Sequence, residues 1–345
     1  MPAWDLRRRL GARRPAVEYV AILLGSTLLM GSSFVAGKIL LGAGVPALLL
    51  VGYRFLVAAL GTLGLVAWEG GLSRRGLLPG GMTRADQLKV VLIGLLQTSA
   101  VMGLLFLAMR EIPAPMAAVL LFTNPIWVAL LARLFLHEAL PKRRAIGLCL
   151  GTLGVALALG AGGAVSGGLW RGQLIGLASA FCWATATLVN KVANLKLGVW
   201  ALSFWQMFIG SLALLAIATL NGERWPSGLT ASHWGWFAWL ALPASTGSFG
   251  LWFMALRRGG ATRTSGYLFL APLFAAVLSY WLLGASLSLQ QALGGLAIAL
   301  GIWLVNREAP AAKPPELHQG SQPAAALPCS PLDRKNEHAA ELDSV

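Results

Sequence analysis

The chain has 345 residues, of which 57% are apolar and only 12% are charged. A soluble globular protein carries about 25% charged residues, so this proportion is too small to cover a water-exposed surface. The mean hydropathy of +0.70 agrees, and the composition predicts an integral membrane protein. The net charge of +14 does not indicate nucleic acid, because most Lys and Arg residues stand in short connections between apolar runs.

Cysteine and histidine are sparse and scattered along the chain. Cys149 and Cys182 fall inside apolar runs, and Cys329 falls near the C-terminus. No spacing is typical of a zinc site or a disulfide framework. The sequence therefore predicts neither a metal nor a cofactor.

Ten apolar runs approach the length of about 20 residues that a transmembrane helix needs. They cover residues 18–41, 45–68, 87–109, 114–136, 145–161, 172–193, 199–220, 233–256, 262–283 and 288–305. The first run follows "RRRLGARR", but it is too long for the apolar core of a signal peptide. We therefore predict an all-α integral membrane fold with ten transmembrane helices.

Basic residues alternate from one connection to the next. They are frequent in the N-terminal arm, residues 1–17, and in the second, fourth, sixth and eighth connections, and they are rare in the others. Because basic residues accumulate on the cytoplasmic side, both termini are predicted to be cytoplasmic. Residues 307–345 are rich in Pro, Ala and polar groups, which predicts a disordered cytoplasmic tail.

One segment of the sequence occurs twice in similar form. "LFTNPIWVALLARLFLHEAL" begins at Leu121, and "LFLAPLFAAVLSYWLLGASL" begins 147 residues later, at Leu268. Other residues align at the same offset, so we predict two five-helix repeats, 18–161 and 172–306. Since five is odd, the second repeat enters the membrane from the opposite side, and the repeats are inverted.

Each repeat carries a proline near the middle of its fourth helix, Pro125 in the first and Pro272 in the second. A proline inside a helix removes one hydrogen bond and frees the carbonyl four residues earlier. In a bilayer such a carbonyl is tolerated where protein or a cavity satisfies it. The two prolines therefore predict paired helix bends that face a shared central cavity.

Several of these features together resemble a known family. "GSSFVAGK" in the first helix, "RF" in the second, and Pro125, Glu138, Gly147 and Gly154 are similar to the pattern of the drug/metabolite transporter superfamily, in its EamA-type branch of ten-helix permeases. The resemblance implies a carrier of small metabolites, amino acids or drugs in the bacterial inner membrane, often an exporter. The second repeat departs from the pattern, because Ala285 stands where the family has Glu.

Arg54 is the charge placed deepest in any span. Inserting a charge at a helix centre costs about 2.5–3.5 kcal/mol, which makes such a residue a functional candidate. Arg54 is expected either to bind a substrate carboxylate in a bidentate pair, or to have a structural role. In the structural role its long side chain reaches the outer interface or donates hydrogen bonds to neighbouring carbonyls. Glu138, at the cytoplasmic end of the fourth helix, is expected to anchor a loop, with a gate latch as the alternative.

Further candidates are polar and aromatic residues inside the spans, because carriers of this architecture bind substrate near the bilayer midplane between the repeats. For any one of them, hydrogen bonding or packing between helices is the commoner role. With Arg54, the predicted substrate-binding residues are Gln97, Thr98, Ser99, Asn124, Trp183, Trp205, Gln206, Ser245, Thr246 and Tyr267.

The sequence thus predicts a secondary transporter that works by alternating access on a small-molecule substrate in a lipid bilayer. No Asp or Glu lies deep in a span, so coupling through a midplane acid is not expected, whereas facilitated diffusion, exchange and coupling through an acid at a helix end stay open. The alternative is a flippase for lipids or lipid-linked substrates. An enzyme is not expected, since the spans hold no catalytic pair of acids or His with an acid. The oligomeric state stays open between monomer and homodimer.

Overall fold

The computed structural model describes residues 3–70, 77, 82–137, 142–158, 169–193, 195, 197–259, 266–285 and 288–306. These residues form helices and turns, with no strand among them. The described helices belong to one compact unit, Met1–Glu308. Glu138 and the tail predicted for 307–345 lie outside the described residues.

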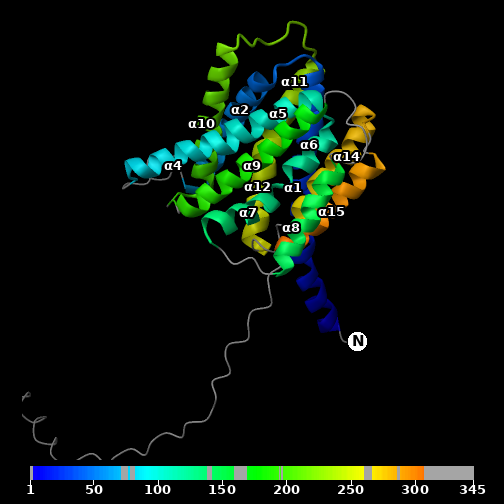
Figure 1. The fold of residues 1–345 in the computed structure, drawn as a ribbon. Helices are drawn as coiled ribbons and strands as arrows, with labels where there is room; N and C mark the ends of the chain where they lie inside the picture. Colours follow the sequence, from blue (N-terminus) through cyan, green and yellow to red (C-terminus); the bar gives the residue numbers. More distant parts are fainter. Residues whose placement is uncertain are drawn as a thin grey trace, which may run out of the picture. The chain divides into compact units, whose positions relative to one another are not determined.

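The first half of the chain forms helices α1 to α8 (Figure 1). A short π-helical stretch, η1, runs directly from α4 into α5 without a break in the helix. The elements are α1 (Ala3–Gly42), α2 (Ala47–Gly70), α4 (Arg84–Gly94), η1 (Leu95–Ala100), α5 (Val101–Glu111), α6 (Ala114–Leu121), α7 (Asn124–Phe135) and α8 (Lys142–Ala158).

The second half follows the same plan, again with a π-helical stretch, η2, inside its third segment. The 3₁₀-helical turn η3 precedes α14. The elements are α9 (Leu169–Ala193), α10 (Val199–Leu220), α11 (Ala231–Ala241), η2 (Leu242–Gly247), α12 (Ser248–Gly259), η3 (Gly266–Phe269), α14 (Leu270–Leu283) and α15 (Leu289–Asn306).

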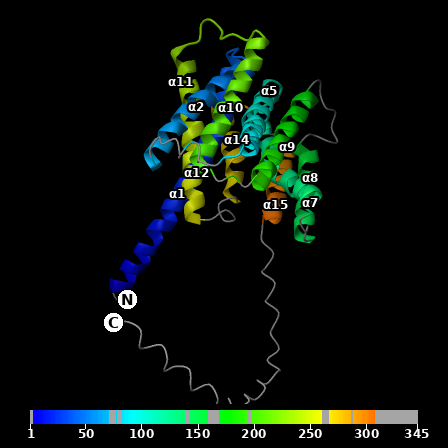
Figure 2. The same ribbon diagram turned by 90° about the vertical axis from the view of Figure 1, so that its left-hand side faces the viewer.

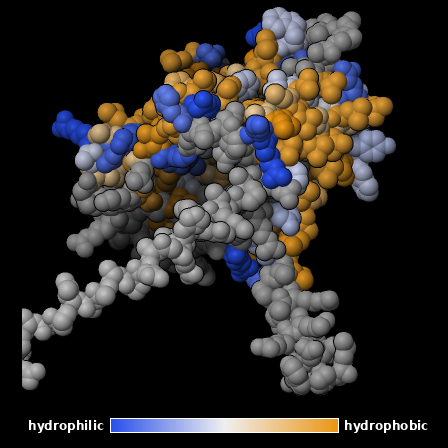
Figure 3. Space-filling model, turned by 60° about the horizontal axis from the view of Figure 1, so that its bottom comes forward, coloured by the Kyte–Doolittle hydropathy of each residue, from blue (hydrophilic) through white to orange (hydrophobic). Residues whose placement is uncertain are grey.

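Six helical stretches among the described residues are long and apolar enough to cross a membrane: Val17–Gly42, Ala47–Ala67, Arg84–Glu111, Ala114–Phe135, Trp170–Ala193 and Val199–Leu220. Three shorter apolar helices are Ala145–Gly154, Leu270–Leu283 and Ala292–Gly301. Apolar side chains dominate much of the described surface in Figure 3, with hydrophilic groups in separate clusters. The prediction of an all-α membrane fold is confirmed.

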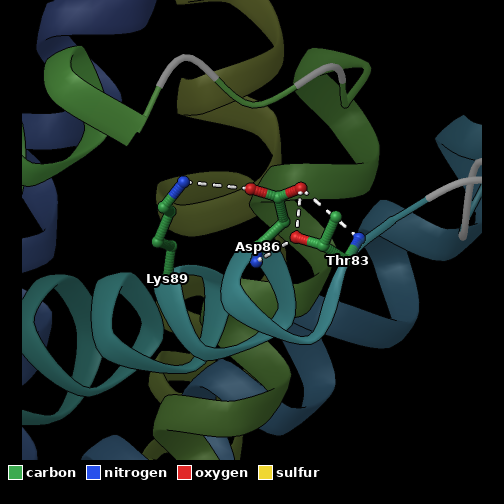
Figure 4. A network of polar contacts seen from close by, with 3 residues as sticks. All are labelled: Thr83, Asp86 and Lys89. Carbon is green, nitrogen blue, oxygen red and sulfur yellow. Dashed lines mark hydrogen bonds and ion pairs between the residues drawn. The ribbon is translucent and has the colours of Figure 1, made fainter.

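A capping box starts α4 and so fixes where the third segment begins (Figure 4). The Asp86 N–H donates to Thr83 Oγ1 at 3.2 Å, and the Thr83 N–H donates back to the Asp86 carboxylate at 3.4 Å. Lys89 Nζ lies 3.0 Å from the other carboxylate oxygen. The box satisfies N–H groups that a helix start would leave unpaired.

Helices α2 and α10 pack side by side and run in opposite directions (Figures 1 and 2). The N–H of Leu49, near the start of α2, donates to the Glu223 carboxylate just after α10 at 3.0 Å. Farther along α2, Thr62 Oγ1 contacts Met207 Sδ in the first half of α10 at 3.8 Å. The residue numbers rise along one helix and fall along the other, so the pair is antiparallel.

Helices α8 and α15 form a second antiparallel pair, which crosses at glycines. A Cβ on Gly154 would lie 2.7 Å from the Gly294 carbonyl oxygen, and a Cβ on Gly301 would lie 2.6 Å from that of Gly147. Gly294 stands 147 residues after Gly147, and Gly301 stands 147 residues after Gly154. Shifting both residues of one contact to their counterparts in the other half therefore gives the other contact. Such reciprocal contacts are what a two-fold axis through the crossing produces.

The two π-helical stretches also stand 147 residues apart, since Leu95–Ala100 maps onto Leu242–Gly247. The ends of α7 and α14 match in the same way. His137 adopts a left-handed φ of 52°, and Gly284, its counterpart, has a φ of 62°. The duplicated sequence therefore corresponds to duplicated local structure, down to single backbone conformations.

Both prolines lie in the first turn of a helix, and the prediction of paired bends stays a prediction. In the first half α6 ends at Leu121, and α7 begins at Asn124, which places Pro125 in the first turn of α7. In the second half Pro272 lies in the first turn of α14, which follows directly on the 3₁₀-helical turn η3. The first turn tolerates proline, because its N–H groups have no partner within the helix.

The basic arm is helical in the structure. The apolar span of α1 begins at Val17, next to residue 18, where the sequence predicts the first apolar run, and the helix itself begins at Ala3. The segment "RRRLGARRPAVE" is rich in good helix formers, so the helix of the first span extends into the arm.

Candidate functional site

A small cavity of about 60 Å³ lies where the two halves meet. We call it the central cavity. Its lining combines α1, α2, α5 and the end of α6 with α9, η2 and α12 of the second half. The lining residues are Met30, Ser33, Phe34, Arg54, Met102, Leu105, Phe106, Leu121, Phe122, Trp183, Ala244, Ser248 and Phe249.

Arg54 brings a positive charge to this cavity from α2, and its side chain is buried, with only 4% of the residue exposed. Its Nε donates a hydrogen bond to Ser245 Oγ at 2.8 Å, and Ser245 Oγ donates onward to the Leu240 carbonyl at 2.8 Å. The guanidinium carbon lies 4.7 Å from the ring centre of Phe55 and 5.5 Å from that of Phe106. Ring faces at these distances attract the cation.

The π-helix η2 places Ser245 for this contact. Its hydroxyl reaches the carbonyl five residues earlier, which is the partner that the wider π-turn presents. Next to it, Thr246 Oγ1 donates to the Ala58 carbonyl of α2 at 2.9 Å. The Ser245 and Thr246 hydroxyls thus bind η2 to two points of α2, Arg54 and Ala58, which lie about one helical turn apart.

No carboxylate forms an ion pair with Arg54 among the described residues. The ion pairs between described side chains are Lys89–Asp86, Arg171–Glu111 and Arg258–Glu18. Arg54 also has no second hydrogen bond within the described part of the chain. A cation that is buried without a counter-ion is costly, so this guanidinium retains the capacity to pair with an anion.

Three of the predicted site residues therefore meet: Arg54 and Trp183 line the cavity, and Ser245 holds Arg54. Trp183 lies edge-on to Phe122, with ring centres 5.9 Å apart. The expectation that Arg54 reaches the outer interface does not match its burial.

The polar residues of the first π-helix have a different environment from their counterparts in the second. Ser99 Oγ donates to the Gly210 carbonyl at 2.8 Å, and Thr98 is buried against Gly210. The backbone of Gln206 lies close to Gly94. Thr98, Ser99 and Gln206 lie where α10 packs on the π-helical segment. Neither they nor the half-buried Gln97 line the central cavity.

Asn124, Trp205 and Tyr267 also lie away from the central cavity lining. Asn124 is buried at the start of α7, and its Nδ2 has no partner among the described residues. Trp205 Nε1 donates to the Leu77 carbonyl at 2.9 Å, and Tyr267 packs edge-on against Tyr19 with ring centres 6.4 Å apart. Sequence position gives the depth of such residues but not the direction in which they point.

Several aromatic residues of the cavity are absent from the predicted site, in particular Phe34, Phe106, Phe122 and Phe249. Phe34 lies inside the motif "GSSFVAGK", and Phe122 stands two residues before Asn124. A helical run rich in Phe is ordinary in a membrane span, so composition alone carries no signal. The position of Phe122 beside a proline break is the one feature that singles it out.

Lys38 is a further residue whose role the structure defines. Its Nζ donates to the carbonyls of Met109 and Ile112, the latter at 2.9 Å. These carbonyls stand at the end of α5, where the helix dipole favours a positive charge. Lys38 thus joins α1 to α5. No group of three or more His, Cys, Asp or Glu side chains gathers in the part of the chain that the structure describes.

Long apolar helices around a buried cation define a multi-pass membrane protein with a polar centre. A profile of the EamA-like transporter family matches residues 18–160 and again residues 170–307. The chain therefore belongs to the EamA-like transporter family, and its resemblance to the EamA-type permeases of the drug/metabolite transporter superfamily is confirmed. Membrane transport is the activity that this family shares.

Similar proteins agree with this family assignment. An uncharacterized transporter of Archaeoglobus fulgidus is 27% identical over 254 residues, which cover 73% of this chain and 85% of the relative. The uncharacterized transporter YoaV of Bacillus subtilis is 25% identical over an alignment that covers 84% of this chain and 96% of YoaV. A solved crystal structure has a similar fold, with a TM-score of 0.59 at 20% identity, covering 84% of this chain and 97% of that one.

Proposed function

We propose that this protein is a secondary transporter that moves a small organic anion across the cytoplasmic membrane by alternating access, as an exporter. The observation that carries the proposal is Arg54. It is buried at the junction of the two halves, faces a cavity and lacks a carboxylate partner among the described residues. A carboxylate of the substrate supplies the missing negative charge, in a geometry that suits the planar guanidinium.

The proposal includes ten spans arranged as two inverted repeats of five helices. In chain order the described elements group as α1, α2, α4–α5, α6–α7, α8, α9, α10, α11–α12, α14 and α15. The packing is reciprocal: α1 contacts α12 and α14, whereas α9 contacts α5, α6 and α7. The antiparallel pairs α2–α10 and α8–α15 support an axis in the membrane plane, as inverted repeats require.

The size of the central cavity supports a closed conformation. Sites for small molecules occupy about 300–1,000 Å³, and this cavity holds about 60 Å³. Opening therefore requires the halves to move apart on one side at a time. We propose that η1 and η2, which interrupt the α-helical hydrogen bonding at equivalent positions, are where the third and eighth helices bend during this motion.

The test is counterflow in proteoliposomes that contain the purified full-length protein. Vesicles loaded with one unlabelled compound are diluted into trace amounts of the same compound in labelled form, and a carrier accumulates the label transiently. The panel contains organic acids, amino acids and cationic drugs. Accumulation of one or more anionic compounds supports the proposal, and accumulation of cationic drugs alone contradicts it. Imposing the gradient in each direction separately decides whether export is the faster direction.

A further inference from the structure

A second hollow, which we call the α14–α15 groove, lies beside the central cavity. It has a volume of about 430 Å³ and is lined by apolar residues alone, namely Val119, Phe122, Leu270, Pro272, Leu273, Ala276, Ala292, Gly295, Leu296, Ile298 and Ala299. Leu273 and Leu296 are more than half exposed. In a membrane protein such residues face hydrocarbon, so the groove opens sideways towards the bilayer.

One side chain lines both hollows. Phe122 belongs to the lining of the α14–α15 groove and to that of the central cavity. Its ring centre lies 6.5 Å from that of Phe34 and 5.9 Å from that of Trp183, both of which line the cavity. Phe122 therefore forms a partition between the groove and the cavity that contains Arg54.

The partition stands in the turn between two helices. Phe122 and Thr123 form the turn between α6 and α7, ahead of Pro125, which cannot continue the helical hydrogen bonding. The Phe122 N–H still donates to the Ala118 carbonyl at 3.0 Å. Rotation of the Phe122 side chain about its Cα–Cβ bond would move the ring out of the partition and leave this backbone hydrogen bond in place.

We propose that the transported anion is amphipathic: a carboxylate whose hydrocarbon chain occupies the α14–α15 groove while its head group binds Arg54, with Phe122 as the gate between them. This inference rests on the proposed function. The volumes favour it, because about 60 Å³ accommodates a head group and few further atoms, whereas 430 Å³ lies within the range of ligand sites.

The first half contains a repeat-related hollow, the α7–α8 groove, of about 740 Å³. Five of its lining positions match lining positions of the α14–α15 groove at the offset of 147. Three of the five carry a hydroxyl or thiol group in the first half: Thr123, Cys149 and Thr152 stand where the second half has Leu270, Leu296 and Ala299, so two hydroxyl groups and a thiol are replaced by hydrocarbon side chains. None of the residues that line the α7–α8 groove also lines the central cavity. This groove therefore serves as an internal control.

The experiment uses the full-length protein in nanodiscs of phosphatidylcholine and two photoreactive palmitates. One palmitate carries a diazirine near the carboxylate and the other near the end of the chain. We expect the first to label peptides of α2 and η2, and the second to label peptides of α14 and α15. Excess palmitate should suppress both labels about tenfold more effectively than methyl palmitate, as expected for a hydrogen bond to a charged group.

Two matched variants place a tryptophan at equivalent, exposed positions. Leu296→Trp fills the α14–α15 groove and should reduce labelling by the chain-end probe at least fivefold, whereas Cys149→Trp, in the α7–α8 groove, should leave it within twofold. Arg54→Met should remove the advantage of palmitate over its methyl ester. A thermal transition close to that of the wild type shows that each variant is folded.

The outcomes separate this inference from the function on which it rests. Labelling of α14 and α15 by both probes, without preference for the acid, indicates an annular lipid and overturns the inference. Equal loss in both Trp variants overturns it as well. If the labelling follows expectation but no compound shows counterflow, the amphiphile site stands and the transport proposal fails. If short anions exchange but neither probe labels the groove, transport stands and the amphiphile site fails.

Discussion

Adding a methyl group at Gly154 or Gly301 tests the crossing of α8 and α15, where glycines at equivalent positions of the two halves meet. A Cβ at Gly154 would lie 2.6 Å from the Ile298 nitrogen, and a Cβ at Gly301 would lie 2.6 Å from the Gly147 oxygen. Ordinary contacts begin near 3.4 Å, so the helices must separate by about 0.8 Å. The obstructing atoms belong to the backbone and cannot rotate away. Overpacking of this kind costs about 1–3 kcal/mol.

We therefore expect Gly154→Ala and Gly301→Ala to lower the thermal stability of the purified protein in detergent by similar amounts. Gly64→Ala is the control, because a Cβ there meets no atom within 4 Å. In a helix interior that substitution should stabilise by about 0.5–1 kcal/mol. If one of the two crossing glycines tolerates alanine while the other does not, the two-fold relation is wrong. If both tolerate it, the crossing itself is wrong.

Three further predictions concern other contacts. Gly52→Ala should destabilise the protein, because its Cβ would lie 2.7 Å from the Leu215 side chain. Adding Leu215→Ala to this variant should restore most of the lost thermal stability, and failure of the rescue would contradict the α2–α10 packing. His137→Gly should raise stability by about 1 kcal/mol, because it relieves a left-handed conformation that Gly284 already occupies; a drop in the thermal midpoint would refute the strain. Ser245→Ala should weaken binding of an anionic substrate about tenfold, because Arg54 loses its hydrogen bond to Ser245. An unchanged affinity in an equilibrium binding assay would show that Ser245 does not position Arg54.

The features that depend on composition and on the internal repeat can be predicted from the sequence. Apolar runs of membrane length predict an all-α membrane fold, and the family resemblance follows from short motifs such as "GSSFVAGK". The offset of 147 aligns Thr98 with Ser245, and the two residues lie in π-helices at equivalent positions. A repeat is readable because the same local constraints require the same residues twice.

The site is predictable only in part, because residue numbers fix the depth of a side chain in a span but not its rotation about the helix. Thr98 and Ser245 are equivalent by sequence, yet Ser245 meets Arg54 whereas Thr98 packs on Gly210. Trp205 is a candidate for a cavity wall by sequence, but its Nε1 binds the Leu77 carbonyl. The sequence singles out Phe122 only by its place beside a proline break, because the two hollows that it lines exist only after the helices have packed.

The charge of Arg54 is the centre of the proposed mechanism, and replacing it by an uncharged side chain of similar length tests that mechanism most directly. The measurement is counterflow in proteoliposomes for an anionic substrate and for its uncharged ester or amide, with the wild type and with Arg54→Met at equal, verified folding. We expect the wild type to exchange the anion and to exclude the neutral analogue, and Arg54→Met to lose exchange of the anion. Undiminished exchange of the anion by Arg54→Met would contradict the account.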